Sequence, residues 1–474
     1  MEGNDRPGGA DPALRAAGAD ADRASHRSLR DPRDVSTATT RPFAGAGVAH
    51  AARARRYGLW VAAAVGLLVL PQVVHTGTAI AIMNQMGIAV VFALSYNMLL
   101  GQGGMLSFGH AVYFGLGGFI AAHVLNLSGR GAIYLPVPVL PLIGGLGGLA
   151  FAILFGSFST RRAGTVFAMI SLGVAELMAA SSLIFDRFFG GEEGITTNRS
   201  KAPLLLGLPF TRDREVYYLI AFWLFVAALA MYAFSRTPVG RMANAVRDNP
   251  ERAEFVGYSQ NRVRLVSFCA AGFFAGIAGG LFAVNYEILT AENMGLTASG
   301  AVLLMTYIGG IGSFVGPIIG AVVFTFLQSM LSDYTGMWLL YLGILFLATV
   351  LFVPMGLAGV LMLHAPAWRA RRIGRLVGPY LLTGALALVA AVGIIGLLEM
   401  IHFVAVSEGA GTTKRLFWMA IAPRTLTPWL AFAALVVVGA LGVRWTAPRA
   451  ASAFAQASRP PVAVRAAATG EAGL

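Results

Sequence analysis

The sequence is 474 residues long, 57% hydrophobic and only 12% charged, with a mean hydropathy of +0.70. These values exclude an ordinary soluble globular protein, in which about a quarter of the residues are charged, and predict a polytopic membrane protein. The net charge of +13 does not indicate nucleic-acid binding, because the basic residues form short runs at the ends of apolar segments, as the positive-inside rule predicts. The single cysteine, Cys269, excludes an internal disulfide and a cysteine metal cluster.

Residues 1–52 are predicted to form a disordered cytoplasmic tail. Residues 1–50 hold seven arginines and seven acidic residues among Ala, Gly, Pro and Ser, which is too polar to bury a core. This leader is too acidic for an organelle transit peptide and too long for a signal peptide, so the apolar run at 59–74 is predicted to be an uncleaved first span. A second disordered cytoplasmic tail is predicted over 453–474.

Apolar segments recur along the rest of the chain, and a transmembrane helix needs about 20 such residues. The predicted fold is all-α and polytopic, with about 10 to 12 transmembrane helices, ten if the two short segments 297–312 and 313–332 do not both cross. The candidate segments are 59–74, 78–100, 105–127, 135–156, 163–186, 216–235, 264–286, 297–312, 313–332, 337–353, 377–400 and 428–445.

Basic clusters predict the orientation, with both termini on the cytoplasmic side. The permease transmembrane domain is expected over 57–365 and an additional transmembrane region of two spans over 366–452, which should not be needed for translocation. Lys414, Arg415 and Arg424 depart from the pattern, because they fall on the predicted outer side. The clusters that fit are Arg53, Arg55 and Arg56, then Arg161 and Arg162, then 236–264, then 369–375, then Arg444 and Arg449.

One apolar stretch, YNMLLGQGGMLSFGHAVYFGLGGF at 96–119, holds seven glycines. On a continuous helix, Gly103, Ser107, Ala111 and Gly115 would form a strip of small residues that allows close helix packing. Gln102 among its glycines instead suggests a broken turn, which a membrane tolerates only where it is buried in protein or lines a cavity. The pattern GGxxSF recurs at 309–314, and paired interrupted segments are typical of transporters around a substrate path.

Polar residues within apolar segments are the candidates for a substrate path. Glu176 lies near the middle of the segment 163–186, where a charge costs roughly 2.5–3.5 kcal/mol, so it is predicted to face protein or water. Such groups can also serve only as interhelical contacts, and that alternative stays open for Asn84, Gln85, Asn285 and Gln328 as well. The predicted path residues are Asn97, Gln102, Ser107, His110, Glu176 and Ser313.

The cytoplasmic segment 236–264 differs from the other loops. Asn249 can cap a helix that starts with Pro250 and ends near Val256, with Gly257 as its terminator. Such a helix is a docking surface, with Ala253 as the small residue expected to meet a partner. The predicted residues for coupling to an ATPase are Arg247, Asn249, Glu251, Ala253, Glu254 and Gly257.

The chain itself is not expected to be an enzyme, nor to hold a cofactor or metal. A nucleotide-binding P-loop requires Gly-Lys-Ser/Thr, but the only lysines, Lys201 and Lys414, follow Ser200 and Thr413. ATP hydrolysis, if it drives transport, must therefore occur on a partner.

The motifs at 101–119, 190–195 (GGEEGI), 240–268 and 303–321 resemble those of branched-chain amino acid ABC transporter permeases, specifically the LivM branch of the LivH/LivM family. The likeness covers about residues 78–365. It implies one permease subunit of a bacterial importer in the inner membrane. It further implies a second, LivH-like permease, two ATPase subunits and a periplasmic binding protein as partners.

Two questions stay open at this point. Similar permeases carry leucine, isoleucine and valine, but others carry urea, amides or aromatic acids. An ion-coupled secondary transporter could use Glu176 for coupling, although it would not need the helix at 250–256. A membrane-embedded enzyme is disfavoured, because Glu192, Glu193 and Asp213 in the outer loop have no histidine beside them.

Overall fold

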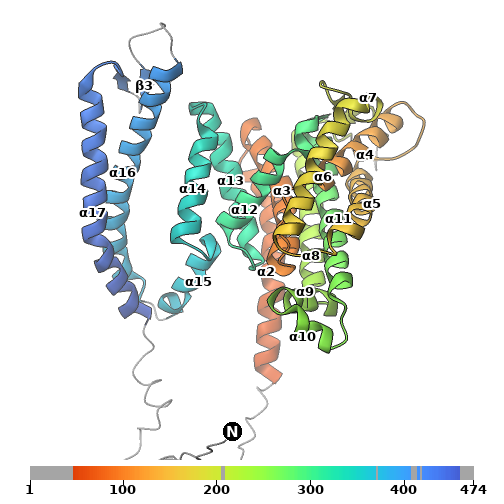
Figure 1. The fold of residues 1–474 in the computed structure, drawn as a ribbon, viewed down its shortest axis with the longest axis horizontal. Helices are drawn as coiled ribbons and strands as arrows, with labels where there is room; N and C mark the ends of the chain where they lie inside the picture. Colours follow the sequence, from red (N-terminus) through yellow and green to blue (C-terminus); the bar gives the residue numbers. More distant parts are fainter. Residues whose placement is uncertain (1–45, 204–208, 370–371, 407–413, 417–418, 459–474) are drawn as a thin grey trace, which may run out of the picture. The chain divides into compact units, whose positions relative to one another are not determined.

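The fold was analysed in a computed structural model that describes residues 46–203, 209–369, 372–406, 414–416 and 419–458. The chain divides into two units, residues 1–70 and 71–474. Of the first unit, the structure describes only the first part of helix α2, which runs Ala46–Val73. All the other elements belong to the second unit, which contains the predicted motifs (Figure 1).

The second unit is almost entirely helical, which confirms the predicted all-α class. Short 3-10 turns and two small antiparallel sheets complete it, with β1 paired to β2 and β3 paired to β4. The elements are α3 (Gly77–Asn97), η2 (Met98–Gln102), α4 (Ala111–Gly129), η3 (Val137–Val139), α5 (Leu140–Ser159), α6 (Thr165–Ile184), α7 (Asp186–Phe189), β1 (Ile195–Thr196), η4 (Arg199–Lys201), α8 (Asp213–Arg236), α9 (Pro238–Asp248), α10 (Pro250–Phe255), α11 (Gln260–Tyr286), β2 (Ile288–Leu289), η5 (Ala291–Met294), α12 (Leu296–Gly309), α13 (Val315–Tyr334), α14 (Trp338–Phe352), α15 (Gly356–Arg369), α16 (Gly374–Val406), β3 (Lys414–Leu416), β4 (Met419–Ile421) and α17 (Leu426–Ser458).

Within the described residues, nine helices are long and apolar enough to cross a membrane, or ten if the bent pair α14 and α15 counts as one span. Two shorter apolar helices, Tyr57–Val73 and α12, add to these. Each of the twelve predicted apolar segments overlaps a helix, so the polytopic architecture is confirmed. Helix α15 was not predicted. It follows α14 at a 43° bend, where Pro354 cannot continue the helix.

The helical ends extend further than the predicted tails allow. Helix α2 begins at Ala46 and α17 continues to Ser458, so 46–52 and 453–458 are helical where the sequence predicted disorder. Alanine is the commonest residue in both stretches, and it is the strongest helix former. The rest of the two predicted tails, 1–45 and 459–474, lies outside the described residues.

Helices α4, α5 and α11 pack through glycines at the centre of the second unit. A Cβ added to Gly117 on α4 would lie 2.6 Å from Gly144 O and 2.6 Å from Gly276 Cα. A Cβ added to Gly280 on α11 would lie 2.8 Å from Pro141 Cα. The glycines of this region therefore allow close backbone approach, as the packing interpretation predicted. They come mainly from the second half of the glycine-rich stretch and from partner helices.

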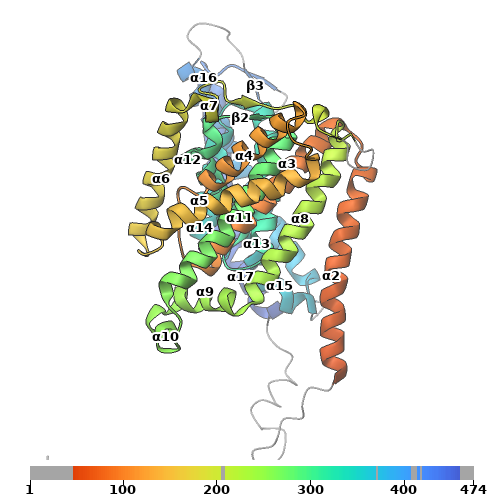
Figure 2. The ribbon, with the colours of Figure 1, turned by 90° about the vertical axis from the view of Figure 1, so that its right-hand side faces the viewer.

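The 27-residue helix α11 runs from one end of the bundle to the other. At 1.5 Å per residue it is about 40 Å long, enough to cross the membrane. Helices α9 and α10 precede it at one end, and β2, paired with β1, follows it at the other (Figure 2). The predicted coupling segment and the predicted outer loop therefore lie at opposite ends of the bundle.

The additional C-terminal region forms a helical hairpin of α16 and α17, which pack against each other. Glu399 on α16 is buried, at 4% exposure. Its Oε1 accepts hydrogen bonds from Thr335 Oγ1 at 2.6 Å and from Tyr341 OH at 2.9 Å. A buried carboxylate with two hydroxyl donors therefore ties the hairpin to the end of α13 and to α14.

We expect Glu399→Leu to destabilise the protein while leaving substrate uptake intact. The change removes the acceptor of two hydroxyls, and an unsatisfied buried partner costs about 1–3 kcal/mol. Thermal unfolding in detergent should show a lower midpoint, and uptake assays should show a normal rate per folded molecule. Ser332→Ala, which removes only an exposed bond to Ser329 O, is the control. A loss of uptake at normal stability would show that the hairpin takes part in transport.

Candidate functional site

The first glycine-rich stretch is not a continuous helix, so the predicted strip of Gly103, Ser107, Ala111 and Gly115 does not form. Helix α3 passes into one π-helical turn, η2, and residues 103–110 are non-helical before α4 begins at Ala111. Gly104 adopts φ +65°, a conformation open to glycine at little cost, and this ends the helix. The broken turn suggested by Gln102 and its neighbouring glycines is confirmed.

Serine hydroxyls from other helices satisfy the backbone of this break. Phe108 N donates to Ser171 Oγ of α6 at 3.0 Å, and Ala111 N donates to Ser299 Oγ of α12 at 3.1 Å. The carbonyl of Ser107 accepts from Tyr96 OH at 3.0 Å. Because lipid offers no hydrogen bonds, a broken backbone must find partners within the protein. The break is thus a built feature, held by α3, α6 and α12.

The second GGxxSF motif forms a comparable break between α12 and α13. Gly310 and Gly312 adopt φ +114° and +84°, and Ser313 Oγ accepts from Gly316 N at 2.9 Å at the start of α13. Ser107 Oγ likewise accepts a bond from Gly109 N, at 3.3 Å. Both motifs therefore interrupt a helix and use their serine to turn the chain into the next one.

Asn97 joins the two breaks. It is buried at the end of α3, where its Nδ2 donates to Ser313 O and its Oδ1 accepts from Gly312 N, each at 3.2 Å. Two predicted path residues, Asn97 and Ser313, are thus brought together. The segments that they connect are more than 200 residues apart in the chain.

Arg247 on α9 contacts the first break from the end of the bundle that carries the predicted coupling segment. Its Nη1 donates to the carbonyl oxygen of Gly101 in η2. Its aliphatic stem fills the space beside Gly104, where an added Cβ would lie 2.6 Å from Arg247 Cγ. Its Nε also donates to Asp248 Oδ1 at 2.9 Å. The side chain therefore points inward to the broken helix.

His110 lies in the core between α3 and α4, at 1% exposure. Its Nε2 lies 2.9 Å from Ser95 Oγ, whose own proton goes to Phe92 O at 2.7 Å, so Nε2 is the donor. The ring stacks on Phe92 and meets Tyr96 edge-on, with centroid distances of 5.6 and 5.3 Å. His110 and Ser107 thus both adjoin Tyr96, and His110 does not reach solvent here.

Two predicted path residues stay apart from these contacts. Gln102 is half-buried in η2, next to Gly101. Glu176 is exposed on α6, and none of the hydrogen bonds of the described residues links it to the other five. The structure therefore places Asn97, Gln102 and Ser313 at the breaks, Ser107 and His110 behind the first break, and Glu176 on another helix.

Helix α10 has the predicted bounds within one residue, Pro250–Phe255. Asn249 Oδ1 caps it by accepting from Arg252 N at 3.0 Å, and Gly257 adopts φ +90°. Ala253 is 3% exposed, packed in a cluster with Ala243, Val246 and Val263, so its side chain faces the protein. Phe255 and Val256 are instead 90% and 72% exposed. The apolar surface open to a partner is formed by these two residues.

At the opposite end, Arg199 is a residue that the sequence analysis did not single out. Its Nη1 donates to the carbonyls of Val284 and Asn285, both at 3.1 Å, and its Nη2 donates to Asp213 Oδ1 at 3.0 Å. Its backbone N donates to Glu287 Oε1 at 2.6 Å. Arg199 thus fixes the outer loop to the end of α11 and the start of α8.

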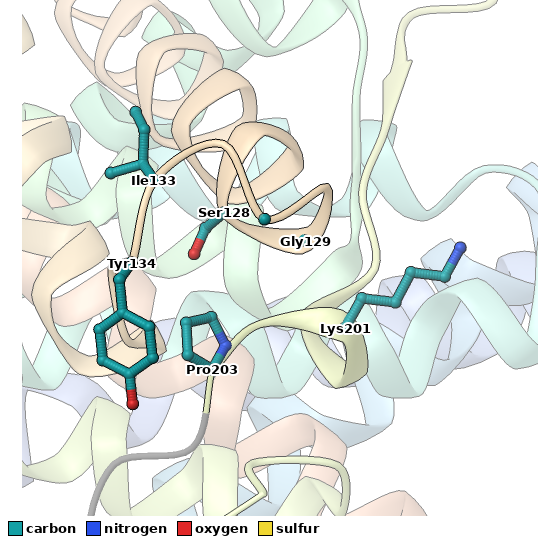
Figure 3. Close-up of a pocket in the computed structure, with 7 residues that line it drawn as sticks. Ser128, Gly129, Ile133, Tyr134, Lys201 and Pro203 are labelled. Carbon is teal, nitrogen blue, oxygen red and sulfur yellow. The ribbon is translucent and has the colours of Figure 1, made fainter.

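A cleft near the same end lies between the turn after α4 and the segment that contains Lys201. Figure 3 shows the Lys201 side chain extending away from Tyr134 and Pro203, so the cation does not point into the cleft. The cleft does not connect to the broken helices through any residue that lines it.

Comparison with known proteins places the chain in a family. The model of the family described as "Branched-chain amino acid transport system / permease component" matches residues 78–354. The chain is 28% identical to the high-affinity branched-chain amino acid transport permease LivM of Escherichia coli, over 62% of this chain and 73% of that protein. A probable LivH permease of Methanocaldococcus jannaschii is 24% identical over 57% of this chain and 88% of that protein.

A ribose import permease, RbsC of Haemophilus influenzae, is 24% identical over 57% of this chain and 81% of that protein. No solved structure matches the chain. The matched range 78–354 contains both glycine breaks, Asn97, Arg247 and the helices α9 and α10. The chain is therefore a multi-pass membrane protein that belongs to the family of branched-chain amino acid transport permease components.

Proposed function

We propose that the chain is a transmembrane subunit of a bacterial ABC importer for branched-chain or related amino acids, driven by ATP hydrolysis on a partner subunit. The observation that carries this proposal is the element formed by α9 and α10. It exposes Phe255 at its tip and inserts Arg247 against the broken helix at its base. One element thus combines a surface for a partner with a contact to a transmembrane segment.

The exposed surface suits an ATPase. Aromatic side chains are frequent anchors in protein interfaces, where they fill a pocket on the partner. Phe255 stands on a helix whose other face is fixed by Ala253 in the cluster with Val263, so the surface is preorganised. In this proposal Asn249 and Gly257 shape the helix, while Glu251 and Glu254 flank Phe255. The end with α9 and α10, together with both chain termini, is then cytoplasmic in the inner membrane.

The other partners in this proposal are a second, LivH-like permease and a periplasmic binding protein. We assign the substrate path to the region of Asn97, Gln102, Ser107, His110, Glu176 and Ser313. Support comes from the two helix breaks, because irregular backbone at membrane depth is typical of transport sites. Opening of a path there would require the breaks to move, since His110 is enclosed in this structure.

An importer for another small polar solute is the second candidate, favoured by the similarity to a ribose import permease. Urea, amides and aromatic acids stay within this alternative. An ion-coupled transporter that uses Glu176 is a third, weaker candidate, because it gives the α9 and α10 element no role.

Uptake into proteoliposomes tests the proposal. Vesicles that contain the chain, its second permease and its ATPase should import labelled leucine only when ATP is inside the vesicles and the binding protein is outside them. Unlabelled isoleucine and valine should compete, whereas ribose and urea should not. A protonophore should have no effect on the initial rate. Uptake that proceeds without ATP and stops with the protonophore would instead support ion coupling.

A further inference from the structure

Glu176 is exposed near the middle of a transmembrane helix. It lies eight residues from the end of α6 at Ile184, about 12 Å at 1.5 Å per residue, and farther from the start at Thr165. Within the described part of the chain, its carboxylate has no hydrogen-bond donor or cation as a partner. Hydrocarbon cannot solvate a carboxylate, and a glutamate is too short to reach the headgroups from this depth. This face of α6 therefore does not face lipid in the working protein.

A glycine on the same face is the second observation. Gly173 is one turn before Glu176, and Ala180 is one turn after it, so the three residues form one exposed strip. A Cβ added to Gly173 meets nothing within 4 Å, whereas Cβ atoms added to Gly144 or Gly276 would collide with a neighbouring helix. No neighbour among the described residues therefore requires position 173 to be small. Small residues on a transmembrane face allow another helix to approach closely.

We propose that this face of α6 is the surface through which the chain contacts the second permease subunit, a different chain that presents a basic or hydrogen-bonding side chain to Glu176. The proposal rests on the proposed function, which supplies that partner. Met169 and Leu177, 74% and 57% exposed, flank the strip and provide apolar contacts. Glu176 then lies between two permease chains, next to the path that they enclose.

The negative charge of Glu176 indicates whether the partner on this face is a different chain or a second copy of this one. A two-fold axis through this face would bring the two copies of Glu176 toward each other, since the same patch occurs on both sides of such an interface. Like charges at close range destabilise one another, most strongly away from water. A different chain with a complementary group avoids this repulsion. The inferred partner is therefore a related permease that is not identical to this chain.

The test compares two glycines that both have open space around them. Gly173→Leu fills the proposed contact, whereas Gly343→Leu makes the same change on α14, where an added Cβ also meets nothing within 4 Å. The variants are co-expressed with the LivH-like permease and the ATPase and purified in detergent through a tag on this chain. Gly173→Leu should reduce recovery of the second permease at least tenfold without lowering the unfolding midpoint of the chain. Gly343→Leu should recover it normally.

Photocrosslinking gives a second readout that does not depend on the stability of the variant. A benzophenone amino acid at Met169 should crosslink to the second permease, whereas one at Phe222, 59% exposed on α8, should not. Normal recovery with Gly173→Leu, or a crosslink from Met169 to another copy of this chain, would overturn the proposal. ATP-dependent uptake by the wild-type complex is measured in parallel. If that uptake is present, these outcomes reject only the interface, whereas its absence rejects the proposed function.

Discussion

Phe255→Asp should abolish both recovery of the ATPase with the purified permease and ATP-dependent uptake. Phe255 is 90% exposed, so the change should leave the fold of the permease intact. Truncating an aromatic anchor of an interface costs about 2 kcal/mol or more, roughly 30-fold in affinity, and a desolvated aspartate adds to that cost. The measurement is the amount of ATPase retained on the tagged permease, followed by uptake in proteoliposomes.

Phe255→Leu is the matched control, because it keeps an apolar side chain at the same position. It should retain most of the ATPase and a measurable rate of uptake. Both variants should enter the membrane as the wild type does, since Phe255 does not lie in a span. If Phe255→Asp binds the ATPase normally, the exposed tip of α10 is not the docking surface.

The structure changes the design of this experiment. The sequence pointed to Ala253 as the small residue at the contact, and Ala253→Asp would have been the natural variant. Ala253 is 3% exposed against Ala243, Val246 and Val263. An aspartate there would disrupt the packing of α9, α10 and α11, so a loss of ATPase binding would not identify the contact surface.

Local signals in the sequence predicted α10 well but missed α9. Asn249 before Pro250, with Gly257 after the helix, gives both the start and the end. Thr237 before Pro238 carries the same signal, and Thr237 Oγ1 accepts from Gly240 N at 3.2 Å in the structure. This helix was missed because its polar residues resemble a loop that only fixes orientation. The Thr237-Pro238 pair is therefore a sequence signal from which the start of α9 can be predicted.

The break in the glycine-rich stretch shows where prediction from the sequence stops. Its glycines indicated an interruption, but hydropathy alone is compatible with a continuous helix, and the strip of small residues followed from that assumption. The groups that hold the break, Ser171 and Ser299, lie 63 and 188 residues away from their backbone partners. Arg199 is similar, because its partners at Val284 and Asn285 follow from the fold and from no local pattern. Contacts of this kind depend on tertiary structure.

Arg247 leads to the second large expected effect, a loss of transport without loss of ATPase binding. Its guanidinium donates to Gly101 O in η2, and Asn97, at the end of α3, bonds to Gly312 and Ser313 in the second break. Movement of α9 upon ATP binding by the docked partner would therefore act first on the first break and then, through Asn97, on the second. Arg247→Met keeps the stem beside Gly104 but removes the donor, and a hydrogen bond from a charged group contributes about 1.5–3 kcal/mol.

We therefore expect Arg247→Met to retain the ATPase on the purified permease but to lower uptake about 10- to 150-fold, which is the rate equivalent of that energy. ATP hydrolysis should continue but no longer respond to the loaded binding protein. Asp248→Asn is the control, because it removes the neighbouring ion pair at 2.9 Å and leaves the bond to Gly101 in place. It should transport normally. If Arg247→Met loses the ATPase, Arg247 belongs to the docking surface. If it transports like the wild type, the contact with η2 has no part in coupling, and the signal must pass through the packing of α9 against α8 and α11.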